Sequence, residues 1–154
     1  MRIAVSSDHR GFTAKQHVVE LLQRANHEVD DFGCPSSQVC DYPDVGLAAA
    51  DAVAEGRCDR GILLCGTGIG MSIAANKVRG VRAAAVHDEL TAMLSRKHND
   101  ANILCLAADL MGEELIRRVI EVFLNTEFEG GRHQRRIQKI TDYEKRNDRV
   151  NQPG

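Results

Sequence analysis

The stretch RGILLCGTGIGMSIAANK, residues 60–77, is the most informative part of this chain for its architecture. Residues 61–65 hold no polar side chain, which is typical of a parallel strand covered by helices on both faces. The glycine-rich residues 66–70 predict a tight turn, and residues 69–78 predict a helix. A buried strand, a turn and a helix in this order predict one repeat of a parallel α/β sheet.

The same alternation continues on both sides of that stretch. Short aliphatic or β-branched runs are separated by segments in which apolar residues recur at helical spacing. Five such units predict an α/β fold, a Rossmann-like three-layer sandwich whose five-stranded parallel sheet is flanked by helices. The expected strands are 3–7, 27–32, 61–65, 82–86 and 102–106, and the expected helices are 12–25, 45–54, 69–78, 88–97 and 112–124.

The C-terminal segment differs in composition from the rest of the chain. The length of 154 residues suits one hydrophobic core, and we expect one domain over residues 1–130. Residues 131–154 are rich in charge, and Ile137 and Ile140 are too few apolar residues to bury a conventional helix against the same domain. This segment is either a solvated tail or a C-terminal arm.

Composition excludes several classes of function. The formal net charge of -2 gives no general attraction to nucleic acid or to a membrane surface, so any anion site must be local. No run approaches the roughly 20 apolar residues that span a bilayer, and no signal peptide is recognisable, so we expect a cytoplasmic protein. The cysteines are odd in number and irregularly spaced, which predicts neither a disulfide framework nor a paired zinc site. Most of them should be reduced and buried.

Ligands of parallel α/β sheets bind beyond the carboxyl ends of the strands. Three segments are expected to meet there: SDH after the first strand, CGTG after the third, and the segment leading to HND before the fifth. In CGTGIG, Gly66, Gly68 and Gly70 let the backbone present amide hydrogens to an anion or an oxyanion at a helix start. The alternative is a nucleotide-binding loop, but Met71 occupies the place of the third glycine of GxGxxG and no GK[ST] follows.

Several side chains near these segments can carry protons. Cys65 lies beside the loop amides, which together with the helix dipole stabilise a thiolate able to act as a base or nucleophile. The alternative is a buried structural cysteine. Asp8 and His9 follow the first strand, and His98 and Asn99 precede the fifth, so two imidazoles and a carboxylate are available to move protons between oxygen atoms. The alternatives are a helix cap at Asp8 and a surface histidine.

The charged tail offers a second anion-binding feature. Arg132 and Arg136 are four residues apart, share one face of a helix and suit a bidentate grip on a phosphate. The alternative is solvated surface charge. A metal site is not expected, because no known ligand spacing is matched by the candidate set of His87, Asp88, Cys34, Cys40 and His98.

Six motifs together resemble the sugar-phosphate isomerases of the ribose-5-phosphate isomerase type B family, which also contains galactose-6-phosphate isomerase subunits. The resemblance runs from Ile3 to about Glu144 and keeps the order and spacing of the family's motifs. One branch of the family uses a glutamate just after the glycine loop in place of the thiol. Met71 stands there and Cys65 is present, so the chain resembles the cysteine branch. The motifs are SSDHRGF, DYPD at 41–44, CGTGIGMSIAANK, GVRAA, LSRKHNDANIL and EGGRHQRRIQKI.

The resemblance implies an aldose–ketose isomerase of a sugar phosphate that works without metal or cofactor. The expected reaction interconverts ribose 5-phosphate and ribulose 5-phosphate by proton transfer through an enediolate. A hexose 6-phosphate, such as allose or galactose 6-phosphate, is the alternative substrate. A catalytically silent sugar-phosphate sensor or partner subunit is an alternative from another class, which the presence of Cys65, Thr67 and His98 disfavours.

Residue roles are implied by the resemblance alone. Cys65 would carry the proton between C1 and C2, and Thr67 would help move the proton between O1 and O2. His98 would open the furanose ring, with Asp8 assisting at the ring oxygen and the hydroxyls. The other residues would bind substrate. His9, Arg132 and Arg136 would hold the phosphate, Asn99 would bind the hydroxyls, and Tyr42 would form part of the pocket wall. Residues 66–72, which include Gly66, Gly68, Gly70 and Ser72, would bind the enediolate.

The resemblance also implies a homodimer with active sites between the chains. The C-terminal arm would reach the neighbouring subunit, so that Arg132 and Arg136 would serve the partner's Cys65 site and a monomer would be nearly inactive. Whether dimers pair into tetramers stays open. The expected ligand is a small sugar phosphate, and no nucleic-acid or membrane partner is expected.

Two positions depart from the family's pattern. Asp109, in LAADLMG, stands where members commonly carry an arginine, which removes a phosphate contact and would weaken binding by about 1–3 kcal/mol. Arg10 follows Asp-His where a small residue is usual. The hypothesis is that Arg10 compensates for Asp109. Without such compensation, the natural substrate would differ from ribose 5-phosphate.

Overall fold

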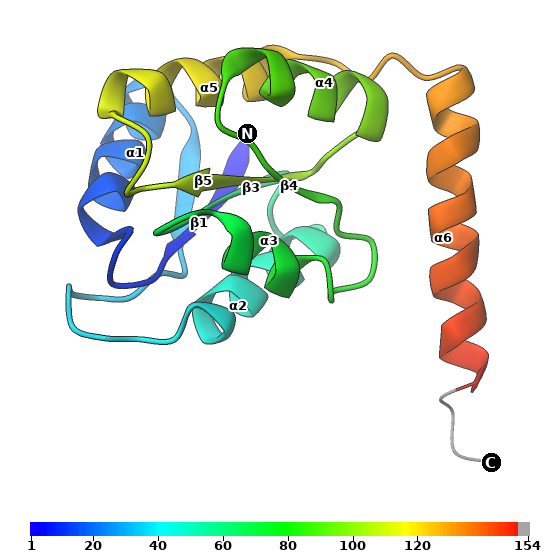
Figure 1. Cartoon of the computed structure of the whole chain (residues 1–154), viewed down its shortest axis with the longest axis horizontal. Coiled ribbons are helices and arrows are strands. Elements are labelled where there is room, and N and C mark those ends of the chain that lie inside the picture. Colours follow the sequence, from blue (N-terminus) through cyan, green and yellow to red (C-terminus); the bar gives the residue numbers. More distant parts are fainter. Residues whose placement is uncertain (151–154) are drawn as a thin grey trace.

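The computed structural model describes residues 1–150 and the side chains of residues 1–146. Within this range, the strands form one sheet with the order β2-β1-β3-β5-β4, and every pairing is parallel. The predicted three-layer α/β architecture is therefore confirmed (Figure 1). The strands are β1 (Arg2–Ser7), β2 (Glu28–Asp31), β3 (Arg60–Cys65), β4 (Ala83–Ala85) and β5 (Ile103–Ala107).

Helices cover both faces of the sheet. The alternation of side chains along β3 divides the core, because Ile62 and Leu64 pack with α1, α4 and α5 while Leu63 and Cys65 pack with α2 and α3. Cys65 therefore points into the α2–α3 layer. The helices of the sandwich are α1 (Phe12–Arg24), α2 (Tyr42–Ala54), α3 (Ile69–Ala75), α4 (Glu89–Asn99) and α5 (Glu113–Asn125).

Element boundaries fall within three residues of the predicted ones, and two of the differences concern the site. α2 begins at Tyr42, three residues earlier than expected, because Pro43 lies in its first turn, where the fixed φ of proline suits a helix start. α4 extends to Asn99 and ends where Asp100 adopts a φ of 44°. His98 and Asn99 therefore lie in the last turn of a helix, two residues beyond the predicted helix end at residue 97.

The loop between β2 and α2 contains the disulfide Cys34–Cys40. The prediction that most cysteines are free and buried is confirmed for the other three, but it is wrong for this pair. The sequence spacing of Cys34 and Cys40 does not indicate a disulfide, because the fold of the loop brings the two residues together. The amide of Cys34 donates a hydrogen bond to the carbonyl of Ser7 at 3.0 Å, which places the start of the loop against β1.

The C-terminal segment forms α6 (Arg132–Val150), which stands apart from the three layers at one end of the molecule (Figure 1). Its start is anchored, since His133 and Ile137 are buried, whereas Ile140 and Tyr143 are 53% and 58% exposed. The segment is thus a helical arm, and its contact with a partner subunit stays a prediction. Residues 151–154 of the predicted arm lie outside the described residues. Over residues 1–150, no helix is both long enough and apolar enough to span a bilayer.

Candidate active site

The thiol of Cys65 lies at the carboxyl end of β3, beside the glycine loop. The residue is 5% exposed, and its Sγ accepts a hydrogen bond from the amide of Gly68 at 3.2 Å. Gly68 has a φ of 75°, and a Cβ at this position would lie 3.1–3.3 Å from the backbone of Cys105 and Leu106, so the turn requires glycine. The sulfur therefore lies in direct contact with the backbone of the glycine loop.

The two other free thiols are less suited to proton transfer. Cys105 is fully buried in β5, and burial raises its pKa. Burial also raises the pKa of Cys58 to about 11, and the hydrogen bond from its Sγ to the Asp30 carboxylate at 3.4 Å adds to the effect. Both thiols therefore stay protonated near neutral pH, and Cys65 is the cysteine best placed for chemistry.

The start of α3 leaves backbone amides available beside this thiol. The amide of Ser72 closes the first helical hydrogen bond, to Gly68 at 3.0 Å, and the amide of Ile69 donates to Oγ1 of Thr67 at 3.3 Å. The amides of Gly70 and Met71 precede the first closed turn and have no acceptor within the helix. They can therefore receive an anion.

Ser72 itself is turned away from this loop. Its amide is used within the helix, and its Oγ donates to the carbonyl of Ala83 on β4 at 3.3 Å. The helix and the neighbouring strand thus engage both groups, and the place of Ser72 in the anion-binding loop stays a prediction. The loop that can bind an anion ends at Met71.

Tyr42 and Gly70 lie against each other at the mouth of this loop. A Cβ on Gly70 would come within 3.0 Å of the Tyr42 ring, so the absence of a side chain allows the ring to rest on the first turn of α3. Tyr42 is 38% exposed. It therefore lies beside the free amides, and its role in lining a substrate pocket stays a prediction.

Asp8 and His9 reach the same edge of the sheet from β1. Ser7 pairs with Leu64, so Asp8 lies level with Cys65 on the neighbouring strand. Asp8 is 6% exposed, and its Oδ1 accepts hydrogen bonds from the amides that follow it, at 2.9 and 3.0 Å. This turn leads into α1, and both of these hydrogen bonds use Oδ1 rather than the other carboxylate oxygen, Oδ2. Nδ1 of His9 lies 3.3 Å from the carbonyl of Cys40, in the disulfide loop.

Arg10 and Asp109 form an ion pair directly above Gly66. Nη2 of Arg10 lies 2.6 Å from Oδ2 of Asp109, and Nε donates to the same oxygen at 2.7 Å. A Cβ on Gly66 would lie 2.6 Å from that oxygen and 2.9 Å from Nε, so the pair rests on the glycine loop. The two positions that depart from the family's pattern are therefore in contact with each other and with the loop.

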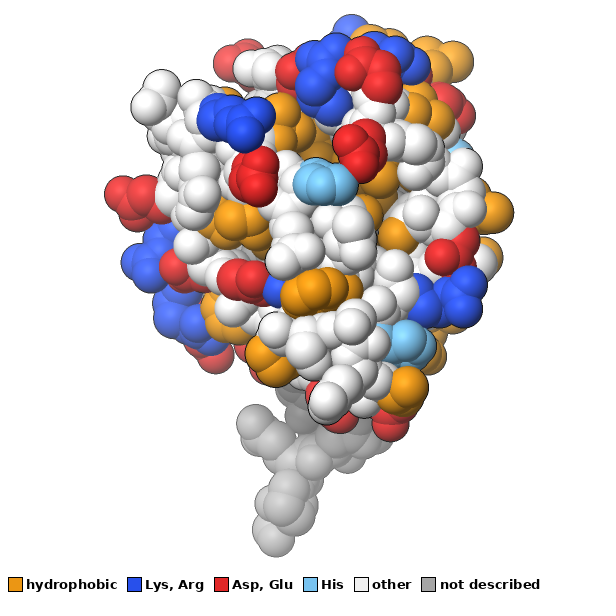
Figure 2. Space-filling model, turned by 90° about the vertical axis from the view of Figure 1, so that its left-hand side faces the viewer, with side chains coloured by type: hydrophobic (Ala, Val, Ile, Leu, Met, Phe, Trp, Pro, Cys, Tyr) orange, Lys and Arg blue, Asp and Glu red, His pale blue; other side chains and the backbone are white. Residues whose placement is uncertain are grey.

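The face on the side away from α6 carries charges of both signs. Figure 2 shows acidic, basic and histidine side chains interspersed with hydrophobic ones there, with no broad basic patch. This agrees with the net charge of -2. A phosphate bound at this edge would thus need further cations from elsewhere.

His98 and Asn99 lie at the opposite edge of the sheet from Cys65. α4 begins after the carboxyl end of β4 and returns the chain to the amino end of β5, and in Figure 1 the arrow of β5 points away from α6. A strand of five residues spans about 15 Å, so one chain cannot bring these residues to its own thiol. The prediction that HND meets SDH and CGTG at one edge of the same chain is therefore wrong. A segment that precedes a parallel strand lies at the strand's amino end.

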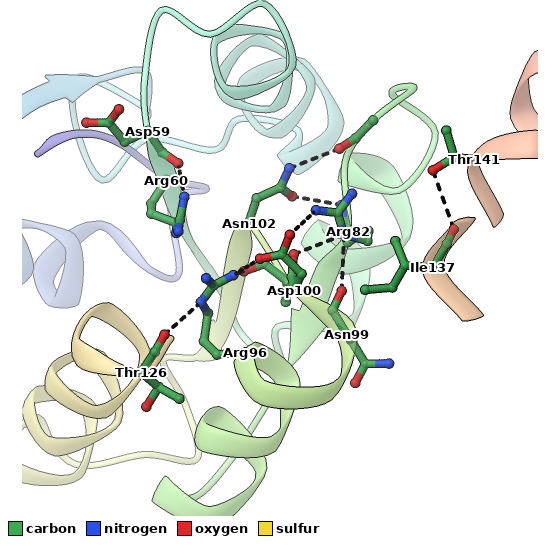
Figure 3. Close-up of polar contacts among 12 residues, drawn as sticks. Asp59, Arg60, Arg82, Arg96, Asn99, Asp100, Asn102, Thr126, Ile137 and Thr141 are labelled. Carbon is green, nitrogen blue, oxygen red and sulfur yellow. Dashed lines mark hydrogen bonds and ion pairs between the residues drawn. The ribbon is translucent and has the colours of Figure 1, made fainter. Parts of the chain in front are cut away.

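Two arginines hold the end of α4 in place (Figure 3). Nε of Arg82 donates to the carbonyls of Asn99 and Asp100 at 3.1 and 2.9 Å, and Nη2 pairs with the Asp100 carboxylate at 3.1 Å. Nη1 of Arg96 pairs with the other Asp100 oxygen at 2.8 Å, and its Nε donates to the Thr126 carbonyl at 3.2 Å. No local pattern in the sequence indicates this network, although the motif GVRAA contains Arg82. The side-chain amide of Asn99 remains exposed.

The first turn of α6 meets the end of α4 through two histidine rings. His98 and His133 are stacked with their centroids 4.2 Å apart and an interplanar angle of 7°. Nε of Arg132 lies 3.4 Å from Nε2 of His133, and Arg136 follows one turn later on the same helix. The structure thus brings His98 and Asn99 near Arg132 and Arg136 of the same chain, away from Cys65.

The same region contains the one set of side chains with metal-binding geometry within the described residues. Ligand atoms of His98, Glu129 and His133 lie within 4.8 Å of one another. The two imidazole rings are nearly parallel, so the lone pairs of their nitrogens lie in parallel planes. Nε of Arg132 also lies against Nε2 of His133. Nε2 of His133 therefore already accepts a hydrogen bond from the Arg132 guanidinium. Asp88, from the set considered in the sequence, caps α4 by accepting the Thr91 amide at 2.7 Å.

Comparison with known proteins places this geometry in a family. The model of the Ribose/Galactose Isomerase family matches residues 3–140. The chain is 45% identical over 145 residues to ribose-5-phosphate isomerase B of Escherichia coli (strain K12), covering 94% of this chain and 97% of the relative. The structure of ribose-5-phosphate isomerase B from Clostridium thermocellum superposes with a TM-score of 0.94 at 47% identity, covering 96% of this chain and 99% of that one.

The structure of ribose-5-phosphate isomerase B from Mycoplasma genitalium with bound ribulose-5-phosphate is also similar. It has a TM-score of 0.90 at 45% identity and covers 94% of this chain and 96% of that one. The family match extends over the sheet, the glycine loop and the start of α6, up to residue 140. The resemblance inferred from the motifs is thereby confirmed, and the chain belongs to the ribose/galactose isomerase family.

Proposed function

We propose that this protein interconverts ribose 5-phosphate and ribulose 5-phosphate. The relatives named above carry this activity in their names, and the M. genitalium structure holds ribulose-5-phosphate. The observation in this chain that carries the proposal is the Cys65 thiol, which lies 3.2 Å from the Gly68 amide beside the free amides of α3. A base next to preorganised donors is what the deprotonation of a carbon acid requires.

Ring opening precedes proton transfer at carbon. As the C1–O4 bond of the furanose breaks, His98 gives a proton to O4, and Oδ2 of Asp8 takes the proton from O1. The aldehyde form is then held with C2 near Cys65. Backbone amides hold the Oδ1 atom of Asp8, so its second oxygen is free for this task.

Isomerisation then moves two protons. The Cys65 thiolate removes the proton from C2, and the electron pair moves to O1 to give the enediolate. Thr67 passes the proton of the O2 hydroxyl to O1, and Cys65 returns its proton to C1, which leaves a carbonyl at C2. The amides of Gly70 and Met71 stabilise the charged intermediate, and the loss of one such donor typically lowers the rate by about 100-fold or more.

We further propose that each site is completed by a second copy of this chain. Cys65 and His98 lie at opposite edges of the sheet in one chain, so the two groups act together only when they come from different copies. His98, Asn99, Arg132 and Arg136 of one copy would then face Cys65, Asp8, His9 and Tyr42 of the other. The arginines would supply the positive charge that the face away from α6 lacks, and His9 would add a phosphate contact.

The Arg10–Asp109 pair bears on the choice of substrate. Asp109 lowers the positive charge at the site, whereas Arg10 offers a guanidinium above Gly66. We propose that Arg10 compensates for Asp109, so that the double variant R10G/D109R restores the phosphate affinity that R10G loses. A double variant that binds no better than R10G would oppose this. A hexose 6-phosphate would then become the better candidate, and a panel of pentose and hexose phosphates would identify it.

The test of the proposed reaction uses deuterated water. The purified protein is mixed with ribose 5-phosphate, and C2 is followed by NMR for exchange of its hydrogen. Exchange together with formation of ribulose 5-phosphate supports the isomerase, and C65A should abolish both while it still binds ligand. Binding without exchange by the unaltered protein would support the silent partner subunit instead.

We place the activity in the cytoplasm, because a charged phosphate ester does not cross a bilayer unaided.

A further inference from the structure

The stack of His98 and His133 has no task in the reaction described above. His133 is 3% exposed, whereas His98 is half-buried and is the residue proposed to act on the sugar. The rings are nearly parallel, with centroids 4.2 Å apart. Rotation of the His98 ring out of this plane would bring it into collision with His133, so the stack restricts the side-chain rotamers open to His98.

We propose that His133 is a positioning residue for ring opening, which holds the His98 imidazole in the orientation that lets it protonate O4. The inference rests on the proposed function and on the assignment of ring opening to His98. It adds a residue that contacts no atom of the substrate and acts through its neighbour alone.

His133 and the residues before it make contacts that hold its segment against α4. Nε2 of His133 lies 3.4 Å from Nε of Arg132, and its backbone amide donates to the Gly130 carbonyl at 3.0 Å. The amide of Glu129 donates to the carbonyl of Lys97, one residue before His98, at 3.1 Å. The segment that leads into the first turn of α6 is therefore hydrogen-bonded to the last turn of α4, and the two rings keep their relative position.

The charge state of His133 suits this task. Burial, followed by the nearby His98 and then Arg132, lowers the pKa of His133, whereas Glu129 opposes the shift. A ring that is neutral near pH 7 stays stacked when His98 gains a proton, since no repulsion between like charges arises. The stack can thus persist through a cycle in which His98 gives up a proton and regains it.

The two substrates of the reaction separate ring opening from proton transfer at carbon. Ribose 5-phosphate is mostly a closed ring and needs His98 before Cys65 can act. Ribulose 5-phosphate has its C5 oxygen blocked by phosphate and its carbonyl at C2, so it has no furanose form and needs no ring opening. Exchange of a C1 hydrogen of ribulose 5-phosphate in deuterated water therefore measures the Cys65 step alone.

The test compares His133→Ala, His133→Phe and His133→Gln in both assays. Phenylalanine keeps a flat ring, so we expect turnover of ribose 5-phosphate within about 3-fold of the unaltered protein. Alanine and glutamine lose the stack and should lower that turnover by about 10-fold or more, with C1 exchange changed less than about 3-fold. If the alanine variant does not fold, the comparison of glutamine with phenylalanine carries the test.

A double variant separates an effect through His98 from a direct one. If His133 acts only through His98, H98N/H133A should be no slower on ribose 5-phosphate than H98N alone. Equal losses in the two assays, or additive losses in the double variant, would overturn the proposal and leave His133 as a structural residue. The unaltered protein tests the proposed function separately, because absence of C1 exchange there would contradict the Cys65 chemistry and not the role of His133.

Discussion

Mixing two inactive variants tests whether each active site contains groups from two chains. C65A lacks the base at the carboxyl edge of the sheet, and H98N lacks the ring-opening group at the amino edge. In a mixed dimer, one site receives Cys65 from the H98N chain and His98 from the C65A chain, so it is intact, whereas the other site lacks both. If equal amounts exchange subunits at random, half of the dimers are mixed and half of their sites work, which predicts about one quarter of the unaltered activity.

The experiment denatures the two variants together, refolds them and measures the conversion of ribose 5-phosphate, with each variant refolded alone as the baseline. A matched control replaces H98N by D8N, because Asp8 and Cys65 lie at the same edge and come from one chain in every site. That mixture should recover no activity. Two outcomes would refute the division of the site between copies. One is recovery of activity in the mixture with D8N. The other is no recovery in the mixture with H98N, once mass measurement has verified that mixed dimers are present.

Three further predictions concern stability. Asp31→Asn should lower the free energy of unfolding by about 3 kcal/mol, since it leaves the buried Lys15 without a carboxylate. Lys15→Met should lower it by only about 1 kcal/mol, because the Asp31 side chain that remains is 44% exposed. Equal losses of unfolding free energy for the two variants, measured by urea denaturation, would contradict this. Gly68→Ala should lower the free energy of unfolding by more than about 2 kcal/mol and abolish activity. The control Gly56→Ala, also at positive φ but in open space, should lower it by about 1 kcal/mol and keep activity. Equal effects of the two variants would contradict this. The pKa of His133 is lowered in the fold, so protonation of this ring favours the unfolded chain. As the pH falls from about 7.5 to 5.5, the melting temperature of the unaltered protein should therefore drop more than that of H133F. Parallel pH profiles of the two melting temperatures would argue against this.

The sheet and its helices could be predicted from the sequence because the signals were local. An apolar run such as residues 61–65 specifies a buried strand, and the glycines after it specify the turn. The boundary of α4 was harder to predict because Asp100 ends the helix through a left-handed φ that Arg82 and Arg96 support from other segments. Such a contact between distant residues has no local signature. The same reason explains the missed Cys34–Cys40 disulfide.

The residues of the site could be named from motifs, but their arrangement could not. Ser72 lies inside the glycine motif, yet its amide and hydroxyl are used by α3 and β4. His98 lies in another motif, and only the path of the chain shows that it faces away from Cys65. The stack of His133 on His98 joins residues 35 apart in sequence (133 − 98), which no periodicity reveals.

The division of polar groups between the two edges has a consequence for the charge of the site. Cys65, Asp8 and the Arg10–Asp109 pair occupy one edge without a surplus of positive charge, while the arginines of α6 lie at the other. In the proposed site, a lone chain has the base together with His9 and Arg10 but lacks the α6 arginines, which lie at its other edge. Under this proposal, the full binding energy of the phosphate, which remote contacts can use to orient the reacting carbons, would become available only on assembly. Association of the chains would thus control catalysis through the substrate's phosphate, even though the thiol and its amides are already in place in each copy.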